Sequence, residues 1–111
     1  MAESIDLLQG TLDLLVLRTV ALRPGHGYAV ARLIKERSKQ VFLVEEGALY
    51  PALHRLERRG LLAEEWGVTD TGREARYYSL TQTGRAHLRA ESKRWTRFAG
   101  AMQRALTAAS A

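Results

Sequence analysis

The chain contains 111 residues, of which 46% are hydrophobic and 26% are charged, and such a composition is typical of a globular domain. The composition excludes extensive disorder, and the length corresponds to one domain rather than two. Lys and Arg number 17 against 12 Asp and Glu, and the resulting net charge of +5 favours a polyanionic partner: nucleic acid first, an anionic membrane surface second.

Several kinds of site are excluded by residue type or spacing. The sequence has no cysteine, which excludes disulfides, thiolate metal sites and a cysteine nucleophile. His26, His54 and His87 are far apart and lack the spacing of metal ligands. No Ser-His-acid arrangement or phosphate-binding loop is present. We therefore expect a protein that is not an enzyme and that uses no metal or cofactor.

No segment indicates a membrane or secreted protein. Asp13 interrupts the apolar segment Leu7–Val20, so no apolar run approaches the length of a membrane span. The N-terminus lacks a basic stretch followed by an apolar core, and no signal peptide is expected. The alanine-rich, weakly apolar end of the chain argues against binding to a membrane surface. The expected location is the cytoplasm.

Apolar periodicity predicts three helices in the first half of the chain. The first covers Asp6–Leu22, carries leucines on more than one face, and ends at an Arg-Pro-Gly sequence. The second covers His26–Ser38. The third covers Glu45–Arg59, with one face of leucines, and stops at a glycine. Between the last two, Val41–Val44 is either a brief strand or a packed linker.

The pattern then changes from helix to strand. Leu61–Trp66 and Ala75–Leu80 combine apolar and aromatic residues around a turn-rich segment, which predicts a β-hairpin. The connection Gly67–Glu74 is too long for a two-residue turn, so its tip should be exposed and mobile. Thr81 is suited to cap a last helix that runs to about Thr107.

The last helix is expected to overhang the domain. At ~1.5 Å per residue it would be about 40 Å long, which exceeds the diameter of so small a domain. Leu88, Trp95 and Met102 recur at heptad spacing on it, with Phe98 between the last two. Such a helix and the apolar first helix both need a partner, and a homodimer is the economical answer. The predicted dimer interface comprises Leu8, Leu12, Leu15, Leu88, Trp95, Phe98, Met102 and Leu106.

Together these elements predict a mostly α-helical fold with a β-hairpin wing. Residues 1–81 would form a winged helix-turn-helix domain that binds DNA, and residues 82–111 a C-terminal dimerisation helix. In a helix-turn-helix the second helix of the pair enters the major groove, and here that helix is Glu45–Arg59. The face opposite its leucines is small at the start and polar further on. Gly47, Ala48, Tyr50, Pro51, His54 and Arg55 are the candidate DNA-binding residues of this helix.

Each candidate has an ordinary structural alternative. Tyr50 donates to a phosphate or packs on the second helix. His54 and Arg55 reach bases or phosphates, and the alternative for His54 is a solvated surface residue. On the wing, Arg73 and Arg76 suit phosphate or minor-groove contacts. The alternative pairs both arginines with Asp70 and Glu74, and a place on the sheet is a further alternative for Arg76.

Four motifs in order resemble the PadR family of bacterial transcriptional regulators. Leu7–Leu17 resembles the family's opening helix, and His26-Gly27-Tyr28 the start of its second helix. Val44–Leu61 is similar to its recognition helix, and Arg76–Gly84 to the exit from its wing. The motifs cover residues 5–84. The short tail matches the subfamily with a single C-terminal helix.

The resemblance implies a dimeric winged helix, usually a repressor, on a dyad-symmetric operator. It implies that Tyr50 and Pro51 lie at the DNA and that Tyr28 touches a phosphate. Short members are often released from DNA by small aromatic or drug-like compounds, and a tryptophan matching Trp95 lines an effector pocket between subunits in some. One departure is Glu74, which makes this wing less basic than is usual in the family.

The predicted function is therefore a sequence-specific regulator of transcription that acts on double-stranded DNA as a homodimer. The alternative is a winged helix that binds another protein and has no specific DNA target. A protein-binding version would present an apolar recognition face, whereas this face carries Tyr50, His54, Arg55 and Arg58.

Overall fold

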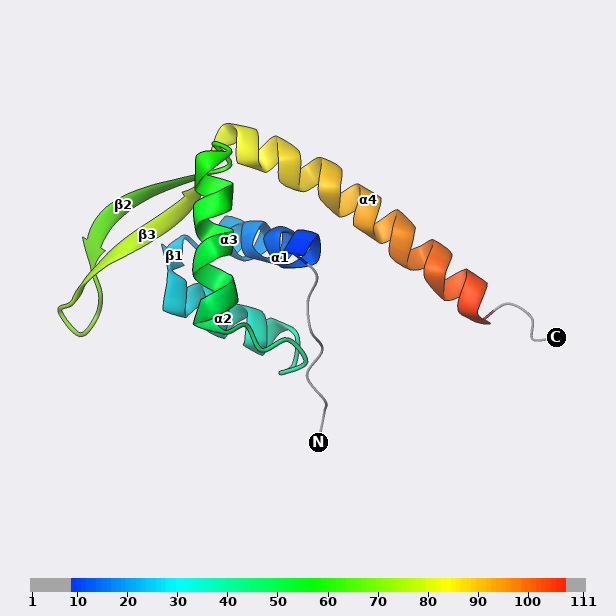
Figure 1. Ribbon diagram of the computed structural model, residues 1–111, viewed down its shortest axis with the longest axis horizontal. Coiled ribbons are helices and arrows are strands. Elements are labelled where there is room, and N and C mark those ends of the chain that lie inside the picture. The colour runs from blue at the N-terminus through cyan, green and yellow to red at the C-terminus, as the bar shows by residue number, and fades with distance from the viewer. Residues whose placement is uncertain (1–8, 108–111) are drawn as a thin grey trace.

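The computed structural model describes residues 9–107 of the chain. In Figure 1 the helices α1, α2 and α3 form a body, from which the β2–β3 hairpin and α4 project to opposite sides. This is the predicted winged helix-turn-helix with a long C-terminal helix. The elements in chain order are α1 (Gln9–Leu22), β1 (Gly25–His26), α2 (Gly27–Arg37), α3 (Glu46–Arg58), β2 (Leu62–Val68), β3 (Glu74–Leu80) and α4 (Gln82–Thr107).

Capping explains small shifts in the helix ends. α2 begins at Gly27 because His26 is its N-cap, and the backbone N–H of Ala29 donates to His26 Nδ1 at 3.3 Å. α3 is one residue shorter at each end than predicted, since Glu45 and Arg59 are its caps. Gly60 follows with a φ of +76°, the left-handed conformation that commonly ends a helix.

The core lies where α1, α3 and the base of the hairpin meet. α1 packs against α2, α3, α4 and β3, which explains why its apolar residues are not confined to one narrow stripe. The leucine face of α3 is fully buried, as predicted, so its opposite face is the one left at the surface. The largest side chains of the core are Tyr78, Leu17, Leu49, Leu53, Leu56, Leu62, Val16, Val20 and Val30.

The hairpin belongs to a three-stranded antiparallel sheet with the order β1-β3-β2. Sequence patterns predicted β2 and β3 but not β1. This strand has two residues, and it pairs Gly25 with Tyr78 and His26 with Tyr77. So short a strand has no periodicity of its own, and only the approach of β3 creates it. β1 ties the start of α2 to the wing.

The segment between α2 and α3 is a packed linker, not a strand. Phe42 and Val44 pack against the core from an irregular backbone. Lys39 and Gln40 turn the chain with φ values of 53° and 68°. The Ser38 hydroxyl accepts a hydrogen bond from the backbone N–H of Phe42 at 3.0 Å, which helps to hold the turn.

A tight elbow joins the wing to α4. Thr81 caps the helix: its Oγ1 accepts from the N–H of Gly84 at 2.9 Å and donates to the carbonyl of Gly60 at 2.6 Å. A β-carbon at Gly84 would lie only 2.1 Å from the carbonyl oxygen of Leu61, so only glycine permits this approach. The direction of α4 is therefore set at the base of the wing.

Beyond the elbow, α4 leaves the body. Gly84 and Leu88 are its buried residues, and the helix continues to Thr107. The described part of the molecule measures 59 × 35 × 21 Å as a result. The predicted overhang is confirmed. Within residues 9–107, none of the helices is both long and apolar enough to span a membrane.

Candidate nucleic-acid interface

The outer face of α3 is open to solvent. Gly47, Ala48, Tyr50, Pro51 and His54 are all exposed, as a DNA-reading helix requires. A β-carbon at Gly47 would meet no atom within 4 Å, so nothing in the protein covers the start of the helix. The backbone of α3 can therefore approach a ligand closely at its N-terminal end.

Tyr50 packs on the second helix of the pair, which is one of the two roles considered for it. Its ring packs on Gly27 at the start of α2, where a β-carbon would come within 2.9 Å of the ring. The side chain nevertheless remains partly exposed, with its edge on the outer face. The contact holds the ring in place between α2 and α3. Gly27 is thus required by packing rather than by backbone conformation.

Arg55 is directed away from the outer face, which corrects its prediction as a DNA contact. Its Nη2 donates to Asp13 Oδ1 on α1 at 2.7 Å, and both side chains are largely buried. A guanidinium held at that depth connects α3 to α1 and is not available to DNA. The signal in the sequence was Asp13, an acid within an otherwise apolar helix.

The wing presents its two arginines differently. Arg73 lies at the exposed turn, where the backbone N–H of Thr69 donates to the carbonyl of Arg73 at 2.8 Å. Within residues 9–107 it forms no ion pair with Asp70 or Glu74. Arg76 lies on the sheet, as the alternative reading had it. Its Nη1 is 3.2 Å from Glu64 Oε1, and its guanidinium lies 5.1 Å from the centre of the Trp66 ring.

A hollow of about 400 Å³ separates the wing from α3 and the start of α2. Its walls are unusually rich in rings, and Trp66, which the sequence analysis did not single out, is one of them. The exposure of Trp66 could have been predicted from the sequence, because a tryptophan near the tip of a two-stranded wing lies far from the hydrophobic core. The lining residues are His26, Gly27, Tyr28, Tyr50, His54, Trp66, Glu74, Ala75, Arg76 and Tyr78.

The carboxyl groups of Glu57 on α3 and Glu64 on β2 lie close together. Burial raises the pKa of Glu57, and the hydrogen bond and negative charge of Glu64 raise it further. Burial likewise raises the pKa of Tyr78, with smaller contributions from Glu64 and Glu57. The positive charge of Arg76 opposes the rise of both pKa values and offsets it only in part.

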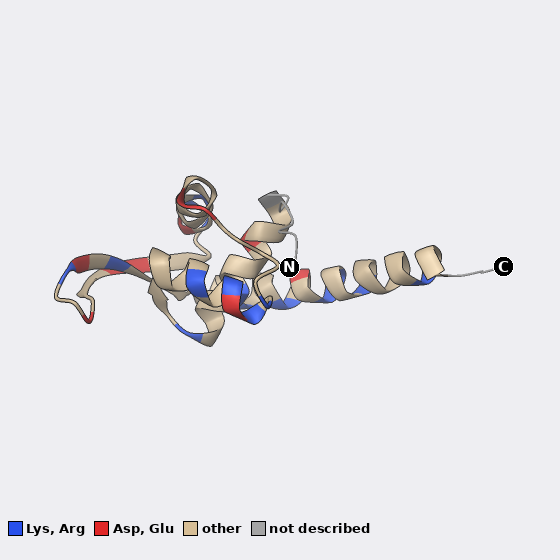
Figure 2. Ribbon diagram, turned by 90° about the horizontal axis from the view of Figure 1, so that it is seen from below, with Lys and Arg blue, Asp and Glu red and all other residues tan. Residues whose placement is uncertain are grey.

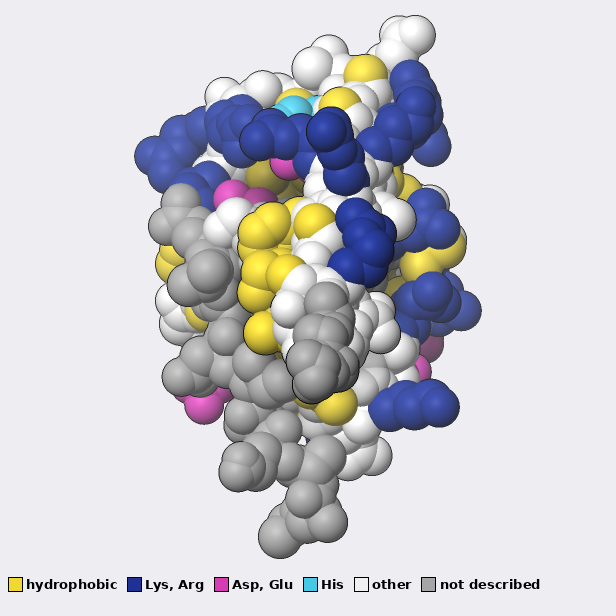
Figure 3. Space-filling view, turned by 90° about the vertical axis from the view of Figure 1, so that its right-hand side faces the viewer, with side chains coloured by type: hydrophobic (Ala, Val, Ile, Leu, Met, Phe, Trp, Pro, Cys, Tyr) yellow, Lys and Arg dark blue, Asp and Glu magenta, His cyan; other side chains and the backbone are white. Residues whose placement is uncertain are grey.

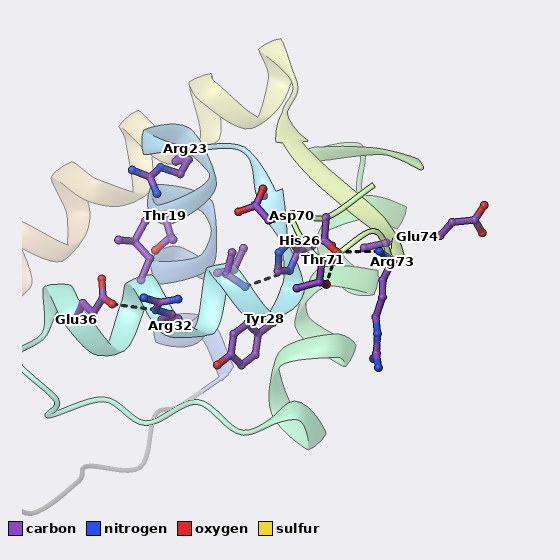
Figure 4. A pocket seen from close by; sticks show the side chains of 16 residues that line it. Thr19, Arg23, His26, Tyr28, Arg32, Glu36, Asp70, Thr71, Arg73 and Glu74 are labelled. Atoms are coloured by element: carbon purple, nitrogen blue, oxygen red, sulfur yellow. Dashed lines mark hydrogen bonds and ion pairs between the residues drawn. The ribbon is translucent and has the colours of Figure 1, made fainter. Parts of the chain in front are cut away.

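A second hollow, of about 660 Å³, lies on the other side of β1, between α2 and the wing turn. Tyr28 projects beside it, whereas Arg73 and Glu74 point away from it (Figure 4). Arg32 pairs with Glu36 at 3.1 Å along α2. Tyr28 is thus an exposed ring at the start of α2 that borders both hollows.

The predicted dimer residues divide into two groups. Leu12 and Leu88 are 5% and 6% exposed, because they belong to the core of a single protomer. That corrects their assignment to the interface, and Leu15 is half-buried beside the same core. Leu8 lies outside the described residues. The other four, on α4, are between 43% and 76% exposed: Trp95, Phe98, Met102 and Leu106.

Charge and apolar surface are separated on α4. Figure 2 shows Lys and Arg at intervals along the helix, and Figure 3 shows hydrophobic side chains gathered beside a flank of Lys and Arg. Trp95 and Phe98 touch, with ring centres 5.6 Å apart. A bare apolar stripe with a basic flank is suited to contact with another helix.

Comparison with known proteins identifies the family. The sequence model of the transcriptional regulator PadR-like family matches residues 16–90. The chain belongs to the PadR-like family. PadR-like proteins are DNA-binding regulators of transcription rather than enzymes, and this chain is therefore a DNA-binding transcriptional regulator. The family that the motifs predicted is confirmed, although the matched region begins near the end of the first motif.

Two relatives resemble the chain in sequence. A protein named transcriptional regulator Rv3488, from Mycobacterium tuberculosis, is 45% identical over 73 residues, which cover 66% of this chain and 64% of the relative. An uncharacterized protein from Lysinibacillus sphaericus is 30% identical over 90 residues, or 81% of this chain and 83% of the relative.

Solved structures share the fold. A PadR family transcriptional regulator from Eggerthella lenta is 31% identical with a TM-score of 0.76, over 91% of this chain and 86% of that one. The protein smu.1704 from Streptococcus mutans is 26% identical with a TM-score of 0.79, over 97% and 95% of the two chains. The similarity thus extends through the wing and into α4.

Proposed function

We propose that this chain is a sequence-specific repressor that binds a dyad-symmetric operator as a homodimer. Two α3 helices, related by a twofold axis, would enter successive major grooves about 34–36 Å apart. Phosphate contacts would supply much of the affinity and make it depend on salt. Repression then needs no further machinery, since a dimer on its operator blocks access to the promoter.

The exposed stripe on α4 is the observation that carries the proposal. Trp95, Phe98 and Met102 project from a part of the helix that leaves its own protomer. Large apolar side chains on an otherwise polar helix favour association. An isologous dimer covers the same stripe on both chains, and its twofold axis supplies the symmetry that a dyad operator matches.

The DNA-facing residues follow from the exposed face of α3 and its surroundings. Gly47, Ala48, Pro51 and His54 would face the groove, and Tyr50 would donate to a phosphate from its place on Gly27. Tyr28 and Arg73 would contact the backbone on either side. Arg55 is not included, because Asp13 holds it inside the protein.

The same stripe supports control by a small aromatic ligand. The tilted pair of Trp95 and Phe98 would face its symmetry mate and offer flat apolar surfaces. A ligand bound there releases the dimer from DNA only if it prefers a dimer geometry that spaces the α3 helices wrongly. Operator affinity that falls with an aromatic effector in the wild type but not in Trp95→Ala would support this role.

A salt titration of DNA binding tests the function. The probe is the duplex upstream of the protein's own gene, compared with an unrelated duplex of equal length. A large preference for the upstream duplex at physiological salt is the expected result. Weak binding to both, lost together as salt rises, would overturn the operator-reading dimer and would favour the alternative of a protein-interaction module.

A further inference from the structure

Trp66 is a large ring left in the open. It stands in the middle of β2 with 65% of its surface exposed, although tryptophan is normally well buried. Solvent exposure of an indole on a rigid strand has a cost that a partner would remove. Its position relative to α3 indicates which partner.

The strand register places Trp66 on the side of the wing that faces α3. Side chains alternate along a strand, so Leu62, Glu64 and Trp66 share one face. Their partners across the ladder are Leu80, Tyr78 and Arg76. Leu62, Leu80 and Tyr78 enter the core against α3, and the same face continues outward to Trp66 and Arg76.

Trp66 therefore faces the hollow that the recognition helix borders. On the far side of this hollow stand Tyr28, Tyr50 and His54. A nucleic acid strand lying beside α3 would pass between these two walls. Of the described residues that line the hollow, Glu74 is the one carboxylate, and it lies toward the tip of the wing.

Arg76 is fixed by its neighbours before any ligand binds. Its guanidinium lies over the Trp66 ring at 5.1 Å, and its Nη1 lies 3.2 and 3.4 Å from the two carboxylate oxygens of Glu64. A guanidinium held by a ring and a carboxylate loses little rotational freedom on binding. The two residues also lie directly across from each other in the ladder, so they form one structural unit.

We propose that Trp66 is a DNA contact, whose indole packs on the deoxyribose of one strand while Arg76, held against the ring, binds the adjacent phosphate. This rests on the proposed function insofar as α3 lies in the major groove. The contact is to the backbone and carries no sequence information. The indole adds an apolar contact to the wing, for which the sequence analysis predicted DNA contacts from Arg73 and Arg76 only.

Salt dependence separates the two members of the unit. Each phosphate contact contributes about −0.9 to the slope of log K against log salt, whereas an apolar contact contributes nothing. Trp66→Ala should weaken binding about tenfold with an unchanged slope, on the scale of one lost stacking contact. Arg76→Gln should reduce the steepness of the slope by about 0.9.

Val68→Ala is the matched control. Val68 is as exposed as Trp66 and lies on the same face of β2, but it does not line the hollow. It should bind as the wild type does. Trp66→Phe keeps a ring and should retain most of the affinity, while the change in tryptophan fluorescence that DNA causes in the wild type should disappear.

The losses should be equal on the upstream and the unrelated duplex, because the backbone is the same in both. Trp66→Ala binding like Val68→Ala would overturn the proposal, and a loss confined to the upstream duplex would show that the indole reads bases instead. A wild type without preference between duplexes would contradict the operator function but leave this comparison intact. A wild type that binds neither duplex would contradict both.

Discussion

Trp66 on the wing and Trp95 on α4 project from opposite ends of the molecule and have different neighbours. Trp66 lies under the guanidinium of Arg76, beside a hollow lined with tyrosines and histidines. Trp95 leans on Phe98, in line with Met102. The first surface combines a ring with positive charge and polar groups, which suits a sugar–phosphate backbone. The second is apolar along its length, which suits a second protein chain.

The comparison teaches that exposure alone does not define an interface. Both indole rings are exposed to solvent. The register of the hairpin determines the neighbours of Trp66, whereas the helical repeat of α4 determines the neighbours of Trp95. Gly84 at the elbow lies between the two regions and sets their relative direction. If the two surfaces serve different partners, a substitution on the wing should weaken DNA binding and leave the dimer intact. A substitution in the stripe should dissociate the dimer and weaken operator binding only as a consequence.

Phe98→Glu should have the largest effect. A charge in the middle of the apolar stripe would have to be desolvated on association. We therefore expect the dissociation constant of the dimer to rise by about 100-fold or more. Operator binding should fall with it, while the monomer remains folded because Phe98 is exposed and does not belong to the core. Sedimentation equilibrium measures the change. Thr96→Glu adds the same charge elsewhere on α4, and equal dissociation in both variants would argue against the stripe as the interface.

Gly84→Ala should come next, because it disturbs the joint itself. The new methyl group would meet the carbonyl of Leu61. We expect a loss of about 1–3 kcal/mol in the free energy of unfolding. Urea unfolding gives this value. Gly47→Ala is the control: its methyl meets nothing, so stability should hold or rise slightly. A stable Gly84→Ala protein with unchanged operator binding would show that the elbow is not rigid.

Asp13→Asn tests whether Arg55 belongs to the body of the protein. Removing the partner of a largely buried guanidinium should lower the free energy of unfolding by about 1–3 kcal/mol. The salt slope of DNA binding should not change, in contrast to Arg76→Gln. Glu36→Gln breaks an exposed pair with Arg32 and should cost at most about 0.5 kcal/mol. A shallower salt slope of DNA binding in Asp13→Asn would indicate that Arg55 contacts DNA after all.

Glu57→Gln should have the smallest effect, and one that depends on pH. Burial and the nearby Glu64 raise the pKa of Glu57 in the folded protein above its ordinary value of 4.5. The folded state then holds the proton more tightly than the unfolded chain, so its contribution to stability is full below the ordinary pKa and is lost as pH rises through the folded pKa.

The amide variant cannot ionise and escapes that loss. It should be more stable than the wild type at neutral pH, and this advantage should shrink as the pH falls toward 4.5. Paired urea titrations of the two proteins between pH 4 and 7 measure the difference, because the contributions of the groups that both proteins share largely cancel. A variant less stable than the wild type at pH 7 would mean that the carboxylate is needed in its ionised form.

Much of the fold could be predicted because it depends on residues near one another in the chain. The leucine face of α3, the glycine that ends it and the Thr81 cap are read within a few positions. The overhang of α4 follows from its length and its exposed stripe. The candidate surface of α3 could be predicted for the same reason, since the burial of one helix face exposes the other.

Other features depend on partners distant in the sequence. Arg55 and Asp13 are 42 residues apart, and only the packing of α3 on α1 turns the arginine inward. Leu12 and Leu88 are both buried in the core of one protomer. Their apolar character alone did not indicate whether their own chain or a partner chain would cover them. β1 exists because β3 passes beside it.

By itself the sequence determined the helices, the hairpin, the recognition face and the family, because periodicity, caps and motifs are local properties. Only the tertiary structure decided the direction of Arg55, the elbow at Gly84 and the place of Trp66 beside Arg76. The physical reason is that burial and ion pairing depend on which surfaces meet, and that is settled when distant segments pack together.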